Sequence, residues 1–190
     1  MKKKLGATNC LYPMPTVLVG ANVKSKPNYI TIAHVGIMDF TSISVSMAKF
    51  HHTNAGIKEN MSFSVNIPSA ELVKVTDYCG IFSGKNVDKG QLFKTFYGEL
   101  KTAPMIQECP INMECRVIQT LDFPKHDIFI GEILETYCDQ KYLTEGVVDF
   151  SKVQPLLFAM NDKSYWKVGD RLGKAWSIGK DFGTHLKDKG

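Results

Sequence analysis

Cationic and hydroxyl side chains cluster at a point where the sequence changes from strand-like to helix-like. The segment AKFHHTNAGIKEN, residues 48–60, begins with one lysine, two histidines and a threonine, namely Lys49, His51, His52 and Thr53. A helix N-terminus presents free N–H groups and the positive end of the helix dipole, and nearby Lys or His side chains add charge. This segment fits a phosphate site, although an ordinary capped helix with two solvated histidines is the plainer interpretation of the segment taken alone.

A second segment has features that suit a flat cofactor. Residues 28–37, NYITIAHVGI, read as an apolar strand that runs into a turn carrying His34. A strand end offers a cofactor ring an apolar shelf together with backbone N–H and C=O groups. A core strand followed by a surface histidine is the plainer interpretation of the same residues.

The third segment is a polar loop. Residues 83–90, SGKNVDKG, contain turn-forming residues and two lysines, so we expect an exposed loop. Lys85 and Lys89 could reach an anion, while Ser83 and Gly84 would let the backbone approach it closely. A solvated surface loop without a ligand remains the alternative.

Composition narrows the class of protein. The 190 residues are 44% hydrophobic, which suits one domain covering residues 1–190. A net charge of +4 lacks the excess typical of nucleic-acid binding, and no window approaches the roughly 20 apolar residues of a membrane span. No apolar run follows the N-terminal lysines, so we expect a cytoplasmic protein with neither nucleic acid nor membrane as a partner.

The cysteines and the short motifs exclude further classes of chemistry. Five cysteines, an odd number with no CxxC pair, indicate free thiols in a reducing compartment and no metal site. The sequence contains no GxGxxG, GxxxxGK[ST], HExxH or GxSxG motif, so a dinucleotide fold, an NTPase, a metalloprotease and an esterase have no motif support.

Hydrophobic periodicity predicts a mainly β protein. Strands are expected at 16–21, 29–33, 43–47, 62–67, 112–121, 128–137 and 155–160. Two helices are expected, at 53–60 with Thr53 or Asn54 as N-cap, and at 69–78 with Gly80 just beyond its end. Because helices are few and turns separate the strands, an antiparallel barrel is favoured over a βαβ sheet.

Taken in order, four blocks of the chain resemble the flavin reductase-like family, to which flavoredoxins belong. They are HTNAGIKENMSFSVNIPS, DYCGIFSGKNVDKG, FYGELKTAPMIQECPINMECRV and IFIGEILETY. The resemblance implies an antiparallel Greek-key split β-barrel with a few short helices. It also implies that the protein binds FMN and forms a homodimer with the flavin near the subunit interface.

The same resemblance implies a set of flavin-binding residues and no catalytic acid or base. The isoalloxazine ring would contact Thr31, Ile32, Ala33 and His34, with backbone contacts from Ser46 and Met47. The phosphate would be held by His52, Thr53 and Asn54, assisted by Ser83 and Lys89. The pocket would be completed by Asn66, Ile67 and Tyr165.

Two positions depart from the family pattern. Many members carry an aromatic residue where this chain has His34 or Val35. Members also often place Arg ahead of the phosphate-binding Thr, a position that Lys49 or His51 must fill here.

Three functions stay open at this point. The first is electron transfer of the NAD(P)H-dependent flavin oxidoreductase type, with the ring performing the redox step. The second is a flavoredoxin-like carrier that exchanges electrons with a redox protein and does not oxidise NAD(P)H. The third, from another class, is a split barrel that binds a non-redox ligand.

Overall fold

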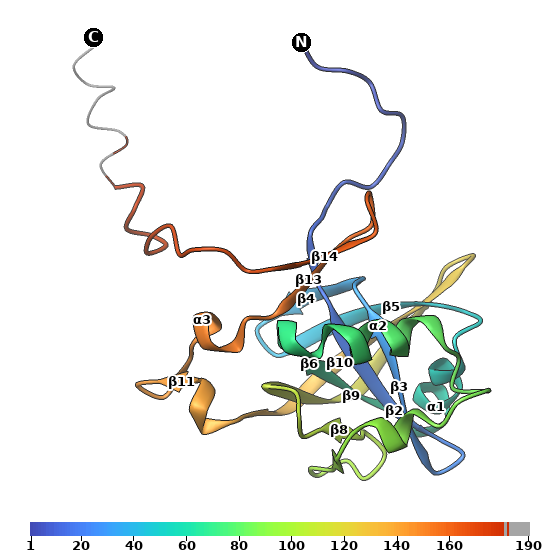
Figure 1. Cartoon of the computed structure of the whole chain (residues 1–190). Helices are drawn as coiled ribbons and strands as arrows, with labels where there is room; N and C mark the ends of the chain where they lie inside the picture. Colours follow the sequence, from blue (N-terminus) through green and yellow to red (C-terminus); the bar gives the residue numbers. More distant parts are fainter. Residues whose placement is uncertain (181, 183–190) are drawn as a thin grey trace.

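A curved seven-stranded sheet forms the body of the protein. The computed structural model describes residues 1–180 and 182 (Figure 1). The sheet order is β3-β2-β6-β9-β10-β5-β4, and every neighbouring pair is antiparallel. Its strands are β2 Val17–Val23, β3 Lys26–Ile32, β4 Val35–Asp39, β5 Ser42–Ala48, β6 Ser62–Ile67, β9 Ile111–Asp122 and β10 His126–Cys138.

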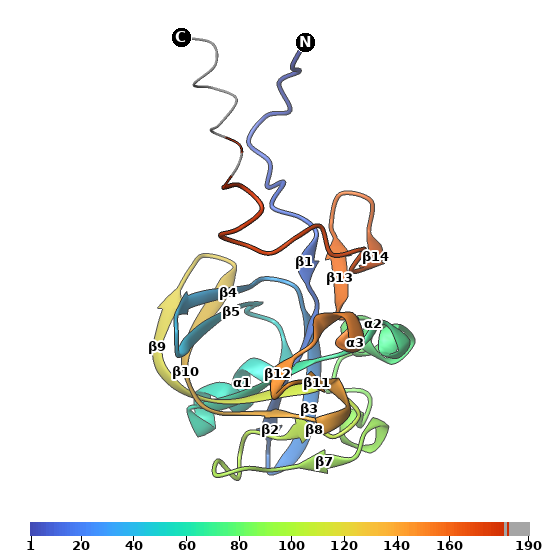
Figure 2. The same ribbon diagram turned by 90° about the vertical axis from the view of Figure 1, so that its left-hand side faces the viewer.

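The two ends of the sheet are joined by one continuous stretch of chain. Strands β3 and β4 follow each other in sequence and are separated only by Ala33 and His34, yet they lie at opposite ends of the strand order. The backbone N–H of Ser46 in β5 donates to the carbonyl oxygen of His34 at 2.9 Å. Figure 2 shows the resulting curvature. We call the line where β3 passes into β4 the seam, and the architecture is the expected split barrel.

Alternation along the strands separates an inner core from an outer face. Val17, Val19 and Ala21 of β2 are buried with the odd-numbered residues of β5 in the cluster that fills the barrel. Ile57, from the helix α1 (His52–Asn60), belongs to the same cluster. Side chains of the opposite parity therefore point out of the barrel, where other elements cover part of them.

Short elements cover the outer face and one end of the sheet. The helix α2 (Val73–Ile81) packs on β2 and β3 through a second core cluster that contains Leu18, Tyr29 and Cys79. The hairpin of β13 (Leu156–Ala159) and β14 (Ser164–Lys167) pairs with β1 (Met14–Pro15). The other elements are η1 Ala70–Leu72, η2 Lys89–Leu92, β7 Thr95–Phe96, β8 Met105–Ile106, η3 Gln140–Tyr142, β11 Leu143–Thr144, β12 Val147–Val148 and α3 Phe150–Val153.

All seven predicted strands are present, but three details of the prediction were wrong. The helix α1 begins at His52 with His51 as its N-cap, so Thr53 and Asn54 are inside the helix and do not cap it. The helix α2 continues to Ile81, so Gly80 is a helical residue. Strands β4 and β14 were not predicted, nor were the two-residue strands β1, β7, β8, β11 and β12. No helix in the described part of the chain has the length and apolar character needed to cross a bilayer.

Candidate functional site

A pocket of about 440 Å³ lies on the outer face of the barrel across the seam. Residues of β5 reach it because the inward positions of that strand are taken by Val45 and Met47, which leaves Ser46 and Ala48 facing outward. We call it the seam pocket. Its lining consists of Thr16, Thr31, Ile32, Ala33, His34, Ser46, Ala48, His51, Asp77, Gly80, His126, Phe158, Met160, Lys163 and Tyr165.

The β13–β14 hairpin forms one wall of the seam pocket and is tied to α2. The Tyr165 hydroxyl donates a hydrogen bond to the Asp77 carboxylate at 2.9 Å. Burial and the neighbouring Asp77 raise the pKa of Tyr165 to about 12, so the hydroxyl keeps its proton at neutral pH. The ring of Phe158 lies against Tyr165, with 5.5 Å between the centroids. The hairpin therefore presents aromatic surface to the pocket.

Three histidines face the seam pocket from separate parts of the chain. The ring centroids of His34 and His126 are 6.3 Å apart, and His34 Nε2 shares a hydrogen bond of 2.8 Å with the Tyr12 hydroxyl. The pKa values of His34 and His51 are both lowered. Desolvation is the larger cause for each, and repulsion from His126 is the second. Nδ1 of His51 is buried and has no hydrogen-bond partner among the described atoms. Neutral His51 thus retains an unused polar atom beside the pocket.

A smaller pocket of about 100 Å³ adjoins the seam pocket at the start of α1. We call it the helix pocket; His51 and Gly80 line both pockets, so the two are contiguous. The N-cap residue His51 gives no side-chain hydrogen bond to the first turn of α1, so that turn's N–H groups have no side-chain cap. The remaining lining residues are Ile30, Phe50, His52, Thr53, Ile81, Phe82, Ser83, Gly84 and Lys89.

Lys89 provides the cationic floor of the helix pocket. The sequence predicted that Lys89 lies on an exposed loop. In the structure this residue is only 2% exposed, so that prediction was wrong for Lys89. The ammonium Nζ donates to the carbonyl oxygen of Cys79 in α2 at 2.7 Å, and no carboxylate of the described residues forms an ion pair with it. Burial lowers the pKa of Lys89, because the charged form loses hydration. An anion in the pocket would offset that loss.

The rim of the helix pocket is shaped by the close approach of two segments. A Cβ atom at Gly84 would lie 1.9 Å from Oδ1 of Asn28, so no larger residue fits there without moving Asn28. Asn28 is itself held, because its Nδ2 donates to Oγ1 of Thr53 at 2.7 Å. Thr53 therefore fixes the pocket wall and does not cap the helix.

The structure gathers ten of the fifteen residues expected at the site into the two pockets. Six line the seam pocket: Thr31, Ile32, Ala33, His34, Ser46 and Tyr165. Four line the helix pocket: His52, Thr53, Ser83 and Lys89. These come from β3, its link to β4, β5, α1, the loop after α2, η2 and β14, so the fold brings together segments far apart in sequence.

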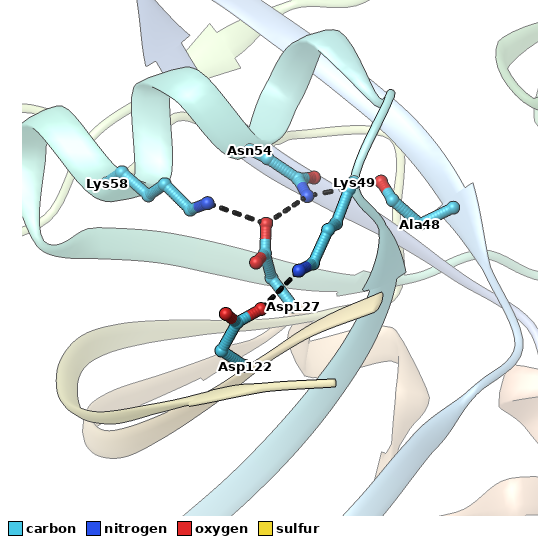
Figure 3. Close-up of polar contacts among 6 residues, drawn as sticks. All are labelled: Ala48, Lys49, Asn54, Lys58, Asp122 and Asp127. Atoms are coloured by element: carbon cyan, nitrogen blue, oxygen red, sulfur yellow. Dashed lines mark hydrogen bonds and ion pairs between the residues drawn. The ribbon is translucent and has the colours of Figure 1, made fainter. Parts of the chain in front are cut away.

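Two of the other five lie in a polar cluster beside α1 (Figure 3). Nδ2 of Asn54 donates to Asp127 at 3.0 Å and to the carbonyl oxygen of Ala48 at 3.2 Å. Lys49 forms an ion pair with Asp122. Both expected phosphate ligands therefore have partners of their own, and neither side chain lines the two pockets.

The last three are removed from the pockets by the alternation of their strands. Met47 points into the barrel core and is fully buried. Asn66 is also fully buried, where it donates to the carbonyl oxygen of Leu18 at 2.8 Å and accepts from Asn112 at 2.8 Å. Ile67 packs against the barrel core. The side chains of all three hold the sheet together and do not line the pockets.

Several pocket residues carry no sequence signal that points to the site. His126 and Asp77 come from β10 and α2, and Phe158, Met160 and Lys163 come from the C-terminal hairpin. His126 could have been found, since it precedes the predicted strand 128–137 in phase with Ile128, which pairs with Ser46. Phe158 and Met160 lie within the predicted strand 155–160, but the pairing of β13 with β1 and β14 that brings them to the pocket is not visible in the sequence.

Comparison with known proteins gives consistent results over most of the chain. The sequence model of the flavin reductase like domain matches residues 9–166. The structure is similar to that of a flavoredoxin from Methanosarcina acetivorans, with 49% identity, a TM-score of 0.93 and coverage of 96% of this chain and 99% of that one.

Two further relatives extend the comparison. A flavoredoxin of Desulfovibrio vulgaris (Miyazaki F) is 39% identical, with a TM-score of 0.88 and coverage of 95% of this chain and 100% of that one. An uncharacterized protein of Archaeoglobus fulgidus is 34% identical over 128 residues, which are 65% of this chain and 72% of that protein.

Proposed function

The chain belongs to the flavin reductase like domain family, and from this premise we propose that it is an FMN-binding redox protein whose flavin occupies the seam and helix pockets. The observation that carries the proposal is the contiguity of the two pockets through His51 and Gly80. One pocket has the apolar strand ends and aromatic hairpin that suit a flat ring. The other has a helix N-terminus and a buried lysine that suit a phosphate.

The residues present fit such a cofactor. Thr16 Oγ1, which is buried at the seam pocket, and His51 Nδ1 have no hydrogen-bond partner among the described atoms. Buried polar atoms are normally paired, so both are suited to a polar ring edge or the chain that follows it. The glycine at position 84 keeps the backbone open beside Asn28, as a close approach of phosphate requires.

Each part of the site has a definite role in this proposal. Bound FMN supplies the electron-transfer chemistry through its ring. Lys89 and the first turn of α1 hold the phosphate, and the hairpin tied through Tyr165 and Asp77 keeps water from one side of the ring pocket. Neutral His34 and Tyr12 form a hydrogen-bonded pair at the pocket edge, where a proton can be held on Nε2 or on the hydroxyl.

The electron donor in this proposal is either NAD(P)H or a redox protein, and the relatives favour the redox protein. The two flavoredoxins at 49% and 39% identity support a carrier that exchanges electrons with a redox protein. Steady-state assays with NADH and NADPH plus free flavin distinguish this from reductase turnover. Turnover with either donor would support the NAD(P)H-dependent oxidoreductase, and no turnover with both would support the carrier.

We also propose that the protein works as a homodimer in a reducing compartment such as the cytoplasm. Ile37 at the edge strand β4 is 87% exposed, and Phe40 in the following turn is 106% exposed, so apolar side chains on this edge strand and just beyond it are uncovered in one copy. A second copy covering it would also protect the sheet edge. The five cysteines form no disulfide. Light scattering of the purified protein tests the dimer.

The flavin proposal is tested by spectroscopy of the purified protein. We expect the visible absorption bands of oxidised flavin, or their appearance with quenched fluorescence when FMN is added to the apoprotein. Riboflavin, which lacks the phosphate, should bind at least about tenfold more weakly. A protein that neither carries nor takes up FMN would contradict the proposal and favour a barrel for a non-redox ligand.

A further inference from the structure

A cationic groove of about 510 Å³ continues from the helix pocket along the β2–β3 turn. His52, Gly84 and Lys89 line both cavities, so a molecule whose phosphate sits over Lys89 can extend into the groove. We call this cavity the lysine groove. It is separate from the seam pocket, with which it shares no lining residue.

The lysine groove carries positive charge that no ion pair among the described residues neutralises. Lys24 and Lys26 reach it from the β2–β3 turn and Lys85 from the loop after α2. All three are exposed, and none forms an ion pair with a carboxylate of the described residues. Like charges held together repel, so the groove attracts an anion.

The only acidic side chain in the groove's lining is already engaged. The carboxylate of Asp88 accepts hydrogen bonds from the backbone N–H of Gly90 and from Nε2 of Gln91, each at 3.0 Å. Its role is to cap η2, the turn that carries Lys89. The lysines also affect a neighbouring titratable group. Burial is the largest cause of the lowered pKa of His52, and repulsion from Lys85 and Lys24 lowers it further.

Apolar surface lies next to these charges. Val23, Pro27 and Val87 line the same groove, with Val23 buried and the other two partly buried. A site for a simple anion such as sulfate needs no apolar wall, whereas a nucleobase does. The combination of lysines and apolar residues suits a nucleoside phosphate.

We propose that the lysine groove binds the adenosine phosphate of a dinucleotide, either the adenylate half of FAD or the adenosine end of a nicotinamide donor. This inference rests on the proposed function, because it takes the flavin phosphate over Lys89 as its starting point. For FAD, the first phosphate occupies the helix pocket, the second lies among Lys24, Lys26 and Lys85, and the adenine packs on the apolar residues.

The test compares FAD with FMN on the same protein. Flavin fluorescence titrations at low and at moderate salt give both dissociation constants for wild type and for the double variant Lys24→Gln/Lys85→Gln. FAD should bind wild type more tightly than FMN does, and the double variant should lose about tenfold in FAD affinity while FMN affinity stays within about twofold. The matched control is Lys74→Gln/Lys94→Gln, which removes two exposed lysines that line none of the cavities.

A second arm separates the two sources of adenosine phosphate. Calorimetry with 5′-AMP on FMN-loaded protein reports binding of a separate nucleotide, which the double variant should abolish. A preference for FAD over FMN that the double variant loses assigns the groove to FAD. AMP binding together with equal FAD and FMN affinities assigns the groove to a nicotinamide donor. Equal FAD and FMN affinities together with no AMP binding would overturn the inference while FMN binding stands. Absence of FMN binding itself would instead refute the proposed function.

Discussion

Lys89 and Cys79 are joined by a hydrogen bond of 2.7 Å from the lysine ammonium to the cysteine backbone carbonyl, inside the protein. The carbonyl lies in α2, and the lysine belongs to the short turn η2. One bond therefore fixes the cation beneath the helix pocket and holds the turn against the helix. A lysine so constrained loses little conformational freedom when an anion binds, since its side chain is already ordered.

Replacement of this lysine should separate phosphate binding from ring binding. Lys89→Met should weaken FMN binding by roughly ten- to a hundredfold, because a charge-assisted hydrogen bond to the phosphate is lost. Riboflavin affinity should change far less. The control is Lys85→Met, which removes a lysine that does not line the helix pocket. Equal losses for FMN and riboflavin would place the effect in folding and not in phosphate binding.

The cluster beside α1 predicts unequal effects for two ion pairs (Figure 3). Lys58 contacts Asp127 at 2.8 Å, and the Asp127 side chain is 4% exposed. Lys58→Met should lower the free energy of unfolding by about 1–2 kcal/mol, less than for a fully buried pair because Lys58 is half-exposed. Lys49→Met, at the surface pair with Asp122, should cost about 0.5 kcal/mol or less. Urea denaturation measures both.

A double variant checks the cause of this difference. Asp127→Asn combined with Lys58→Met removes the buried charge as well as its partner, so it should be more stable than the sum of the two single variants predicts. Additive losses would mean that Lys58 acts through its packing and not through Asp127.

The histidines predict that the apoprotein loses stability on acidification. The folded-state pKa values of His34, His51 and His52 all lie below the ordinary value. The unfolded chain therefore binds more protons as the pH falls through about 6.5. The stability is complete above that pH and is lost as the pH falls through the folded-state values. Thermal unfolding across about pH 5 to 7.5 measures it.

His51→Gln should flatten that profile, because it removes the histidine whose Nδ1 has no partner. FMN should flatten it as well, since a nearby phosphate favours the protonated ring. Asp127 does not complicate the window, because its pKa is lowered from a value that is already below 4. An unchanged slope in His51→Gln would assign the pH dependence to other groups.

The tie between the C-terminal hairpin and α2 predicts a further effect. Tyr165→Phe removes the hydroxyl that donates to Asp77, and should cost about 1 kcal/mol of stability and weaken FMN binding several-fold. Tyr142→Phe is the control, because the Tyr142 hydroxyl forms no hydrogen bond within the described residues. Differential scanning fluorimetry and flavin titration measure the two effects. Equal behaviour of the two variants would argue against a role for the tie.

The strands could be predicted from the sequence because alternation is a local signal. The segment 62–67 was predicted with its observed bounds, and β9 and β10 each extend the predicted strand by only one or two residues at an end. The helix start was predicted one residue late. A Thr or Asn is the usual N-cap, but here Thr53 accepts a hydrogen bond from Asn28 of β3, and this tertiary contact outweighs the local preference.

The site was predictable only where its residues lie on one side of a strand or in one turn. Asn66 is the penultimate residue of β6, but it pairs with Leu18 and faces a buried amide network. Lys89 appeared exposed because its neighbours are polar, whereas η2 turns its side chain under α2. Which face a residue occupies depends on register between distant strands, and a single sequence does not contain that information.

The short link at the seam also limits the width of the seam pocket. Only Ala33 and His34 separate the last residue of β3 from the first residue of β4, and a residue of extended chain reaches at most about 3.6 Å. The distance between the two ends of the sheet is thus limited by covalent length and does not depend on how well the side chains pack. The number of residues in this link therefore limits how broad a molecule can lie across the seam.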